Sequence, residues 1–204
     1  MSEQANERAL HGRRVRIRPW QRRDSLAQEL WPRYIEPFSS LWNIPRTIFY
    51  DDDLLRSGWS SQRYAWAIDD QQNRMVGRIS LREIDTRRGS ARLGISLSQT
   101  HVGQGLGTEA LTLFLDYYFG PLGYMTMNLD VAAINKRAVR CYERLGFAYV
   151  ESEWRSAGND PSLRLLEDPH FADAVPHFRR GRYETLVEFY EMSLNRADWL
   201  EHPH

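Results

Sequence analysis

The sequence of 204 residues contains one cysteine, Cys141, and one lysine, Lys136. A single cysteine excludes an intrachain disulfide framework and is typical of a protein in the reducing cytoplasm. No apolar run approaches the roughly 20 residues that a helix needs to cross a bilayer, and the N-terminal stretch lacks the apolar core of a signal peptide. The formal net charge is zero, so no overall field selects nucleic acid or an anionic membrane. We expect a cytoplasmic protein that binds neither nucleic acid nor membrane.

Hydrophobic residues make up 42% of the chain and aromatic residues 12%, which are typical of a globular protein with a sizeable core. Strand-like runs occupy residues 14–20, 63–70, 74–85, 89–98, 124–131, 147–154 and 182–194. Apolar spacing predicts helices at residues 106–119 and 136–145, and one or two short helices within residues 22–42. We therefore expect a single domain over residues 1–204 of mixed α/β (α+β) class. Helices would flank a mixed central sheet of about six to seven strands.

Two stretches are harder to interpret. Four aromatic residues recur at helical spacing, which predicts a core-facing stripe or the lining of a binding pocket; they are Trp31, Tyr34, Phe38 and Trp42. Residues 156–181 contain prolines and glycines without a clean period, and so predict an inserted loop. This loop is a candidate for a lid, for a contact in a homodimer, or for a solvated excursion.

Three glycines, Gly103, Gly105 and Gly107, stand at alternate positions directly before the predicted helix of residues 106–119. A turn into a helix start leaves several backbone N–H groups unpaired, and glycine lets phosphate oxygens reach them. The pattern therefore predicts a pyrophosphate cradle, with a ligand-free tight turn as the alternative. Dinucleotide loops need G-x-G-x-x-G, but Thr108 stands at the last glycine position. Nucleoside-triphosphate loops need Gly-Lys-Ser/Thr, which is absent here.

A second motif, NKRAVRCYERLGF, occupies residues 135–147. Asn135 stands at the predicted helix start, where its side chain can cap free amides. Ala138 and Tyr142 follow at one and two turns, so all three share a helix face. Gly146 and Phe147 then lead the chain into the next strand. Taken alone, Asn135 is a cap and Tyr142 a core tyrosine.

Together the two motifs resemble the GNAT superfamily of acyl-CoA N-acetyltransferases. The similarity is strongest over residues 90–154. Within the superfamily, the run LGISLSQTHVGQGLGTEAL is most similar to the ribosomal-protein alanine acetyltransferase group (RimJ/RimL-like), and the strand RRVRIRPW followed by Asp24 also fits that group. The resemblance implies direct transfer of an acetyl group from acetyl-CoA, the co-substrate, to an amine, without a metal.

The resemblance also implies the residues that bind coenzyme A. The backbone of the loop would hold the pyrophosphate; its residues are Val102, Gly103, Gln104, Gly105, Leu106, Gly107 and Thr108. The main chain of Ile95 and Leu97 would pair with the pantetheine arm at a place where two strands separate. Asn135 would hydrogen-bond the pantetheine, and Ala138 would leave room for it.

Acetyl transfer to an amine needs a proton for the leaving thiolate of coenzyme A and a neutral attacking amine. Tyr142, with a usual pKa of about 10, suits the first task as a general acid. Many relatives carry a glutamate base two residues before the position of Gly94, but this chain has Arg92 there, which cannot accept a proton. Glu83 and Asp85 are alternative bases, as is a water relay. Cys141 is interpreted as packing, because direct transfer needs no nucleophile.

The acceptor remains open between three hypotheses. The subgroup resemblance favours a peptide or protein N-terminus. A small amine is the alternative, either an aminoglycoside or a polyamine, because NKRAVRCYERLGF is also similar to aminoglycoside 6′-acetyltransferases. The acidic side chains at Asp51–Asp53, Glu83 and Asp85 would attract such polycations if the fold brings them together. The third hypothesis is a non-catalytic acyl-CoA-binding module, which rests only on the missing strand glutamate.

Overall fold

The computed structural model describes residues 9–43 and 64–201. Its strands are β1 (Leu10–His11), β2 (Val15–Pro19), β3 (Tyr64–Asp70), β4 (Met75–Asp85), β5 (Ser90–Leu97), β6 (Thr126–Ala132), β7 (Ala148–Ser156), β8 (Phe178–Arg180) and β9 (Thr185–Asn195). Its α-helices are α1 (Arg22–Glu29), α2 (Leu106–Phe119), α3 (Lys136–Arg144) and α4 (Arg196–Glu201). Four 3-10 helices complete it: η2 (Ser39–Leu41), η3 (Gln99–His101), η4 (Pro161–Glu167) and η5 (Pro169–His177).

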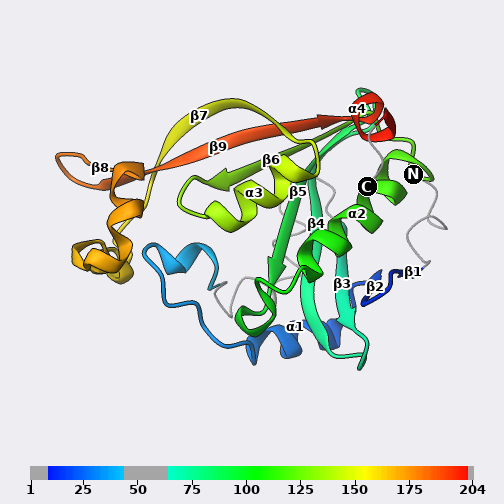
Figure 1. Cartoon of the computed structure of the whole chain (residues 1–204), viewed down its shortest axis with the longest axis horizontal. Helices are drawn as coiled ribbons and strands as arrows, with labels where there is room; N and C mark the ends of the chain where they lie inside the picture. The colour runs from blue at the N-terminus through cyan, green and yellow to red at the C-terminus, as the bar shows by residue number, and fades with distance from the viewer. Residues whose placement is uncertain (1–8, 44–63, 202–204) are drawn as a thin grey trace.

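The strands form one mixed sheet in the order β1-β2-β3-β4-β5-β6-β9-β7, with β8 added to β9 (Figure 1). Only β5 and β6 pair in parallel among the described strands, and α2 connects them. All seven predicted strands are present, so the prediction of a mixed α/β fold is confirmed. The described sheet has nine strands rather than six or seven because the short strands β1 and β8 add to it.

The helices cover opposite faces of the sheet. In Figure 1 both α2 and α3 lie in front of the sheet, and Thr108 of α2 contacts Cys141 of α3 at 3.2 Å. Side chains alternate along a strand, so Val15 and Ile17 of β2 join the core beneath α2 while Arg18 points to the other face. Arg18 there binds Asp24 of α1 at 2.7 Å, which places α1 on the opposite face from α2.

Strands β5 and β6 separate partway along their length. Their pairing ends at Leu93 and Leu129, although β5 continues to Leu97 and β6 to Ala132. On its other side β5 remains paired with β4, and the amide of Ser98 donates to the carbonyl of Val76 at 2.8 Å. Because hydrogen-bonding directions alternate in an antiparallel pair, the main-chain groups of Leu97 face away from β4. They therefore face the gap between β5 and β6.

The prediction of one or two short helices within residues 22–42 is confirmed by α1, which ends at Glu29, and by the 3-10 turn η2. The helical spacing of the four aromatic residues does not correspond to a continuous helix. Proline lacks an N–H donor, and Pro32 and Pro37 both interrupt this stretch. Of its four aromatic residues only Phe38 is buried. The segment 156–181 contains η4, η5 and β8, and Asp51–Asp53 lie outside the described residues.

Candidate active site

The glycine loop between η3 and α2 contains two left-handed glycines. Gly103 has φ +76° and Gly105 has φ +78°, a backbone conformation that side-chain-bearing residues rarely adopt. A Cβ atom on Gly103 would meet nothing within 4 Å, so the loop is open there. Gly107 serves a different purpose, because a Cβ atom on it would lie 3.0 Å from Cδ1 of Leu97. The third glycine thus lets α2 approach β5 closely.

The geometry of this loop fits a phosphate group. Gly105 is the N-cap of α2 and provides no side-chain cap to the first helical turn. The N–H groups at the start of a helix have no intrahelical partner, and the helix dipole adds partial positive charge there. An anion can therefore accept hydrogen bonds from the amides at the start of α2, and no side chain of Gly103 obstructs it.

Arg14 adds a cation to the loop. Its Nη1 donates to the carbonyl of Gln104 at 2.9 Å, and its Nη2 lies 3.1 Å from the position a Cβ atom would take on Gly105. Glu109 holds this guanidinium by accepting from Nε of Arg14 at 2.8 Å. The sequence analysis missed Arg14, because nothing in the chain shows that residue 14 lies beside a loop some 90 positions later.

The predicted face of α3 has formed. Asn135 caps the helix by accepting from the amide of Ala138 at 3.2 Å, as the sequence predicted. Tyr142 is buried and packs against Phe147, with ring centroids 5.7 Å apart. Burial raises the pKa of Tyr142 well above its usual value, and the nearby negative charge of Asp130 acts in the same direction. The hydroxyl is therefore protonated at neutral pH and can act only as a proton donor.

The open edge of β5 is occupied at one point by a side chain. The hydroxyl of Tyr34 donates to the carbonyl of Leu97 at 2.8 Å. This carbonyl belongs to the main chain that the resemblance assigns to the pantetheine arm, together with that of Ile95. Burial raises the pKa of Tyr34 to about 12, so its hydroxyl is a donor across the physiological pH range.

The segment that carries Tyr34 spans the gap between the separated strands. On the far side of the gap, Glu36 forms an ion pair with Arg137 of α3 at 2.9 Å. Phe38 packs into a small apolar cluster with Ala132 of β6 and Phe189 of β9. Residues 34–38 therefore connect the edge of β5 to the opposite wall of the gap.

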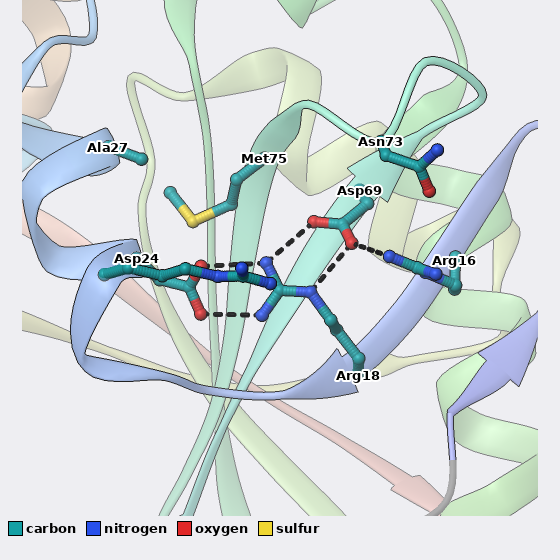
Figure 2. Close-up of a pocket in the computed structure, with 8 residues that line it drawn as sticks. Arg16, Arg18, Asp24, Ala27, Asp69, Asn73 and Met75 are labelled. Carbon is teal, nitrogen blue, oxygen red and sulfur yellow. Dashed lines mark hydrogen bonds and ion pairs between the residues drawn. The ribbon is translucent and has the colours of Figure 1, made fainter.

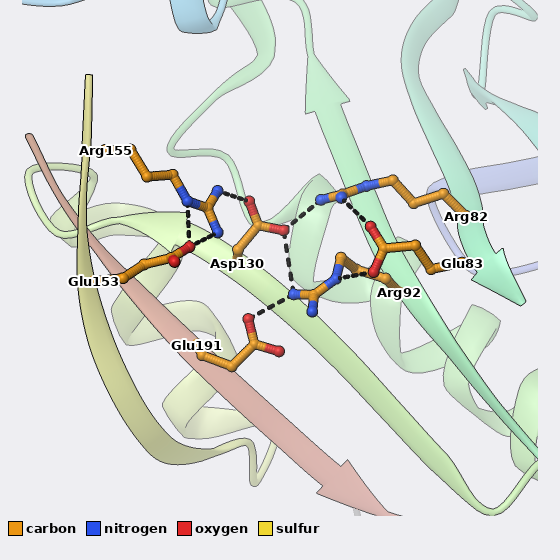
Figure 3. A network of polar contacts seen from close by, with 7 residues as sticks. All are labelled: Arg82, Glu83, Arg92, Asp130, Glu153, Arg155 and Glu191. Carbon is orange, nitrogen blue, oxygen red and sulfur yellow. Dashed lines mark hydrogen bonds and ion pairs between the residues drawn. The ribbon is translucent and has the colours of Figure 1, made fainter. Parts of the chain in front are cut away.

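The two predicted bases lie in different places. Glu83 accepts from Nε of Arg92 at 2.8 Å and also binds Arg82 (Figure 3). Burial opposes ionisation of Glu83, but the two arginines outweigh this effect and lower its pKa. Asp85 pairs with Ser90 at the start of β5, where β5 and β6 have not yet separated. It accepts from the amides of the turn that follows, and these hydrogen bonds lower its pKa.

A second buried ion cluster lies between α1 and the sheet. Arg18 lies between Asp24 and Asp69 and binds both carboxylates, while Arg16 binds Asp69 from the other side (Figure 2). These residues line a cavity of about 370 Å³, and Arg23 also contributes to its lining. Asp24 also accepts from the amide of Gln21 and so caps α1. Because Arg18 of β2 binds both Asp24 of α1 and Asp69 of β3, we interpret the cluster as structural: it joins β2, β3 and α1.

The described part of the chain contains neither a membrane-spanning helix nor a group of metal ligands. None of its helices is long and apolar enough to cross a bilayer. Its histidine, cysteine, aspartate and glutamate side chains form no group of three or more that could hold a metal ion.

Comparisons with known proteins agree with this geometry. Residues 14–148 match the acetyltransferase (GNAT) domain family. Spermidine N(1)-acetyltransferase of Vibrio cholerae serotype O1 is 27% identical over 136 residues, covering 65% of this chain and 67% of that protein. The Escherichia coli K12 protein of the same name is 28% identical over 149 residues, covering 68% and 75%.

Solved structures show the same fold at lower identity. A GCN5-related N-acetyltransferase from Brucella melitensis aligns with a TM-score of 0.61 and 20% identity, over 95% of this chain and 81% of that one. The spermidine/spermine N-acetyltransferase SpeG from Vibrio cholerae aligns with a TM-score of 0.58 and 21% identity, over 94% and 98%. With two thirds of its residues matched to one family, the chain belongs to the GNAT acetyltransferases and is an acetyl-CoA-dependent N-acetyltransferase.

Proposed function

We propose that the acceptor is a small aliphatic polyamine rather than a peptide N-terminus. The observation that carries this proposal is the naming of the curated relatives at 27% and 28% identity, which are spermidine acetyltransferases. These relatives lend no support to the narrower RimJ/RimL-like assignment. We also propose that the whole chain is one catalytic domain with an insertion at residues 156–181, and that it works in the cytoplasm, where the free Cys141 stays reduced.

Coenzyme A would occupy the face of α2 and α3. Backbone amides from Val102 to Thr108 would bind its pyrophosphate, and Arg14 would add positive charge. The pantetheine arm would pair with Ile95 and Leu97 along the open edge of β5. Asn135, whose Oδ1 is used by its own helix, would donate its amide N–H₂ to the arm, and Ala138 would leave space beside it.

The proton transfers would divide between two groups. Tyr142 would protonate the departing thiolate. Burial raises the pKa of Tyr142, which keeps the hydroxyl protonated in the absence of a ligand but makes it a weaker acid than an exposed tyrosine. Glu83 and Asp85 remain the bases proposed from the sequence. Of the two, Glu83 has the better location, since it binds Arg92 immediately before the point where β5 and β6 separate.

The test is thiol release from acetyl-CoA across a panel of acceptors. The panel contains spermidine, spermine, putrescine, aminoglycosides and peptides with different N-terminal residues. Turnover of polyamines with kcat/KM at least tenfold above that of every peptide supports the proposal. Preference for a peptide overturns the polyamine assignment and supports a peptide or protein N-terminus as the acceptor. Tight acetyl-CoA binding without turnover of any member of the panel overturns the polyamine assignment and leaves the acceptor among amines outside the panel.

A further inference from the structure

Leu93 and Leu129 form the last residue pair before the gap between β5 and β6, and both join the core beneath α2 and α3. Because side chains alternate along a strand, Arg92 and Asp130 point to the face of α1. Coenzyme A would enter from the face of α2 and α3, so the acceptor amine would approach from the face of α1. Arg92 and Asp130 lie on that face at the start of the gap.

An ion cluster surrounds this mouth of the gap (Figure 3). It joins side chains from β4, β5, β6, β7 and β9, namely Arg82, Glu83, Arg92, Asp130, Glu153, Arg155 and Glu191. Three arginines face four carboxylates, so the cluster carries one excess negative charge. An approaching ammonium group is therefore attracted, and it needs a carboxylate that the arginines leave partly free.

The carboxylates differ in how fully the arginines engage them. Asp130 binds Arg82, Arg92 and Arg155. Burial opposes its ionisation, but these arginines prevail and lower its pKa. Glu83 also has two arginine partners.

Glu191 and Glu153 each bind a single arginine, and of these two Glu191 lies beside the residue pair where the gap begins. Its Oε2 accepts from Nη1 of Arg92 at 2.5 Å, and its Oε1 has no partner within residues 9–43 and 64–201. Glu191 pairs in register with Asp130, the first residue of β6 beyond the last pair with β5. Its side chain is 22% exposed. A carboxylate oxygen is thus available beside the gap.

We infer that Glu191 binds the ammonium group of the acceptor at the mouth of the gap and that Arg92 is the positioning residue that holds it there. This inference rests on the proposed function, since it assumes a cationic amine as acceptor. Arg92 occupies the strand position where many relatives have glutamate, and its guanidinium extends toward β9 to hold a carboxylate supplied from that strand. The carboxylate that we assign to the acceptor therefore comes from β9 rather than from β5.

The test is the variant Glu191→Gln, which keeps the shape of the side chain and removes its charge. A hydrogen bond to a charged group contributes enough that its loss should raise the acceptor KM by about 10- to 100-fold. The kcat should change by less than threefold, and the Kd of acetyl-CoA should stay at the wild-type value. The matched control is Glu153→Gln, which removes a charge from the same cluster on β7, where Glu153 binds only Arg155. Glu191→Asp should restore part of the affinity.

The outcomes separate the two proposals. An acceptor KM that rises in Glu191→Gln but not in Glu153→Gln supports the inference. If the acceptor KM of both variants equals that of the wild type, the inference is overturned. If KM rises equally in both variants, the effect comes from the overall charge of the cluster, and the inference is also overturned. If the wild-type protein acetylates only peptides, the polyamine proposal is overturned but the inference about Glu191 is not, because a peptide N-terminus is also an ammonium group. The KM of that peptide is then compared between the same variants.

Discussion

The pyrophosphate cradle can be tested by placing a negative charge at Gly105. Gly105 has φ +78°, so any other residue costs about 1–2 kcal/mol of backbone strain, and less for asparagine or aspartate. A new Cβ atom would lie 3.1 Å from Nη2 of Arg14, which is the end of a flexible side chain and can move. Domains of this kind have about 5–15 kcal/mol of stability. Gly105→Asp and Gly105→Asn should therefore both fold.

The two variants should differ greatly in binding acetyl-CoA. Two unit charges about 5 Å apart interact with about 3 kcal/mol at an effective dielectric constant of about 20. The pyrophosphate carries two negative charges, so Gly105→Asp should weaken binding by at least about 100-fold relative to Gly105→Asn. Arg14 is placed to bind the new carboxylate and would then hold it inside the loop.

Isothermal titration calorimetry of both variants against acetyl-CoA makes the comparison, with thermal unfolding of each as the control for folding. The pair is matched in shape and in backbone strain, so that only the charge differs. Equal Kd values for the two variants would refute the reasoning, because no phosphate could then lie beside residue 105.

Three further predictions concern the candidate active site and the ion cluster around Arg18. Tyr142→Phe should lower kcat by about 100-fold without changing the Kd of acetyl-CoA; an unchanged kcat at saturating acceptor removes Tyr142 from proton transfer. Tyr34→Phe frees the carbonyl of Leu97 for the pantetheine amide and should tighten acetyl-CoA binding by about two- to tenfold; weaker binding in calorimetry contradicts the assigned competition. Burial opposes ionisation of Asp24, but its bonds to Arg18 and Gln21 prevail and lower its pKa. Its contribution to stability is therefore full above about pH 4 and is lost as the pH falls through the lower folded-state pKa. Urea unfolding of Asp24→Asn should show a loss of about 3 kcal/mol at pH 7 and a smaller loss at pH 2; an equal loss at both pH values denies the charge a role.

The features that we propose bind coenzyme A could be predicted because they are local in sequence. The glycine loop and α2 are continuous over residues 102–119, and the Asn135 cap, Ala138 and Tyr142 lie on one short helix. Helix periodicity and capping preferences act over a few residues, so their signals are visible without a fold. The order of the strands was visible for the same reason. Arg14 escaped prediction because its contact with the loop depends on how β2 packs beside α2.

The aromatic stretch before the undescribed segment shows the opposite case. Spacing alone suggested a helix for Trp31, Tyr34, Phe38 and Trp42, but side-chain spacing does not provide hydrogen bonds where proline removes donors. The segment instead crosses the gap in an irregular path, with Phe38 in a left-handed conformation at φ +61°. Its contacts to Leu97 and Arg137 lie 63 and about 100 positions away in the chain. No local pattern carries such information.

The charged cluster proposed to bind the acceptor differs from the glycine loop in how it is built. Five strands, β4, β5, β6, β7 and β9, each contribute one or two charged side chains to the mouth of the gap. Several of these side chains find a partner only when the strands assemble: Arg92 of β5, for example, reaches Glu191 of β9 across the intervening strand β6. Substitution of one partner leaves an unpaired charge, whereas exchange of both can preserve the cluster. The charged residues at this mouth can therefore stand on different strands in different sequences while the glycine loop keeps its recognisable pattern. This is why the coenzyme A site can be proposed from two short motifs, while the acceptor site is proposed from the geometry around Glu191.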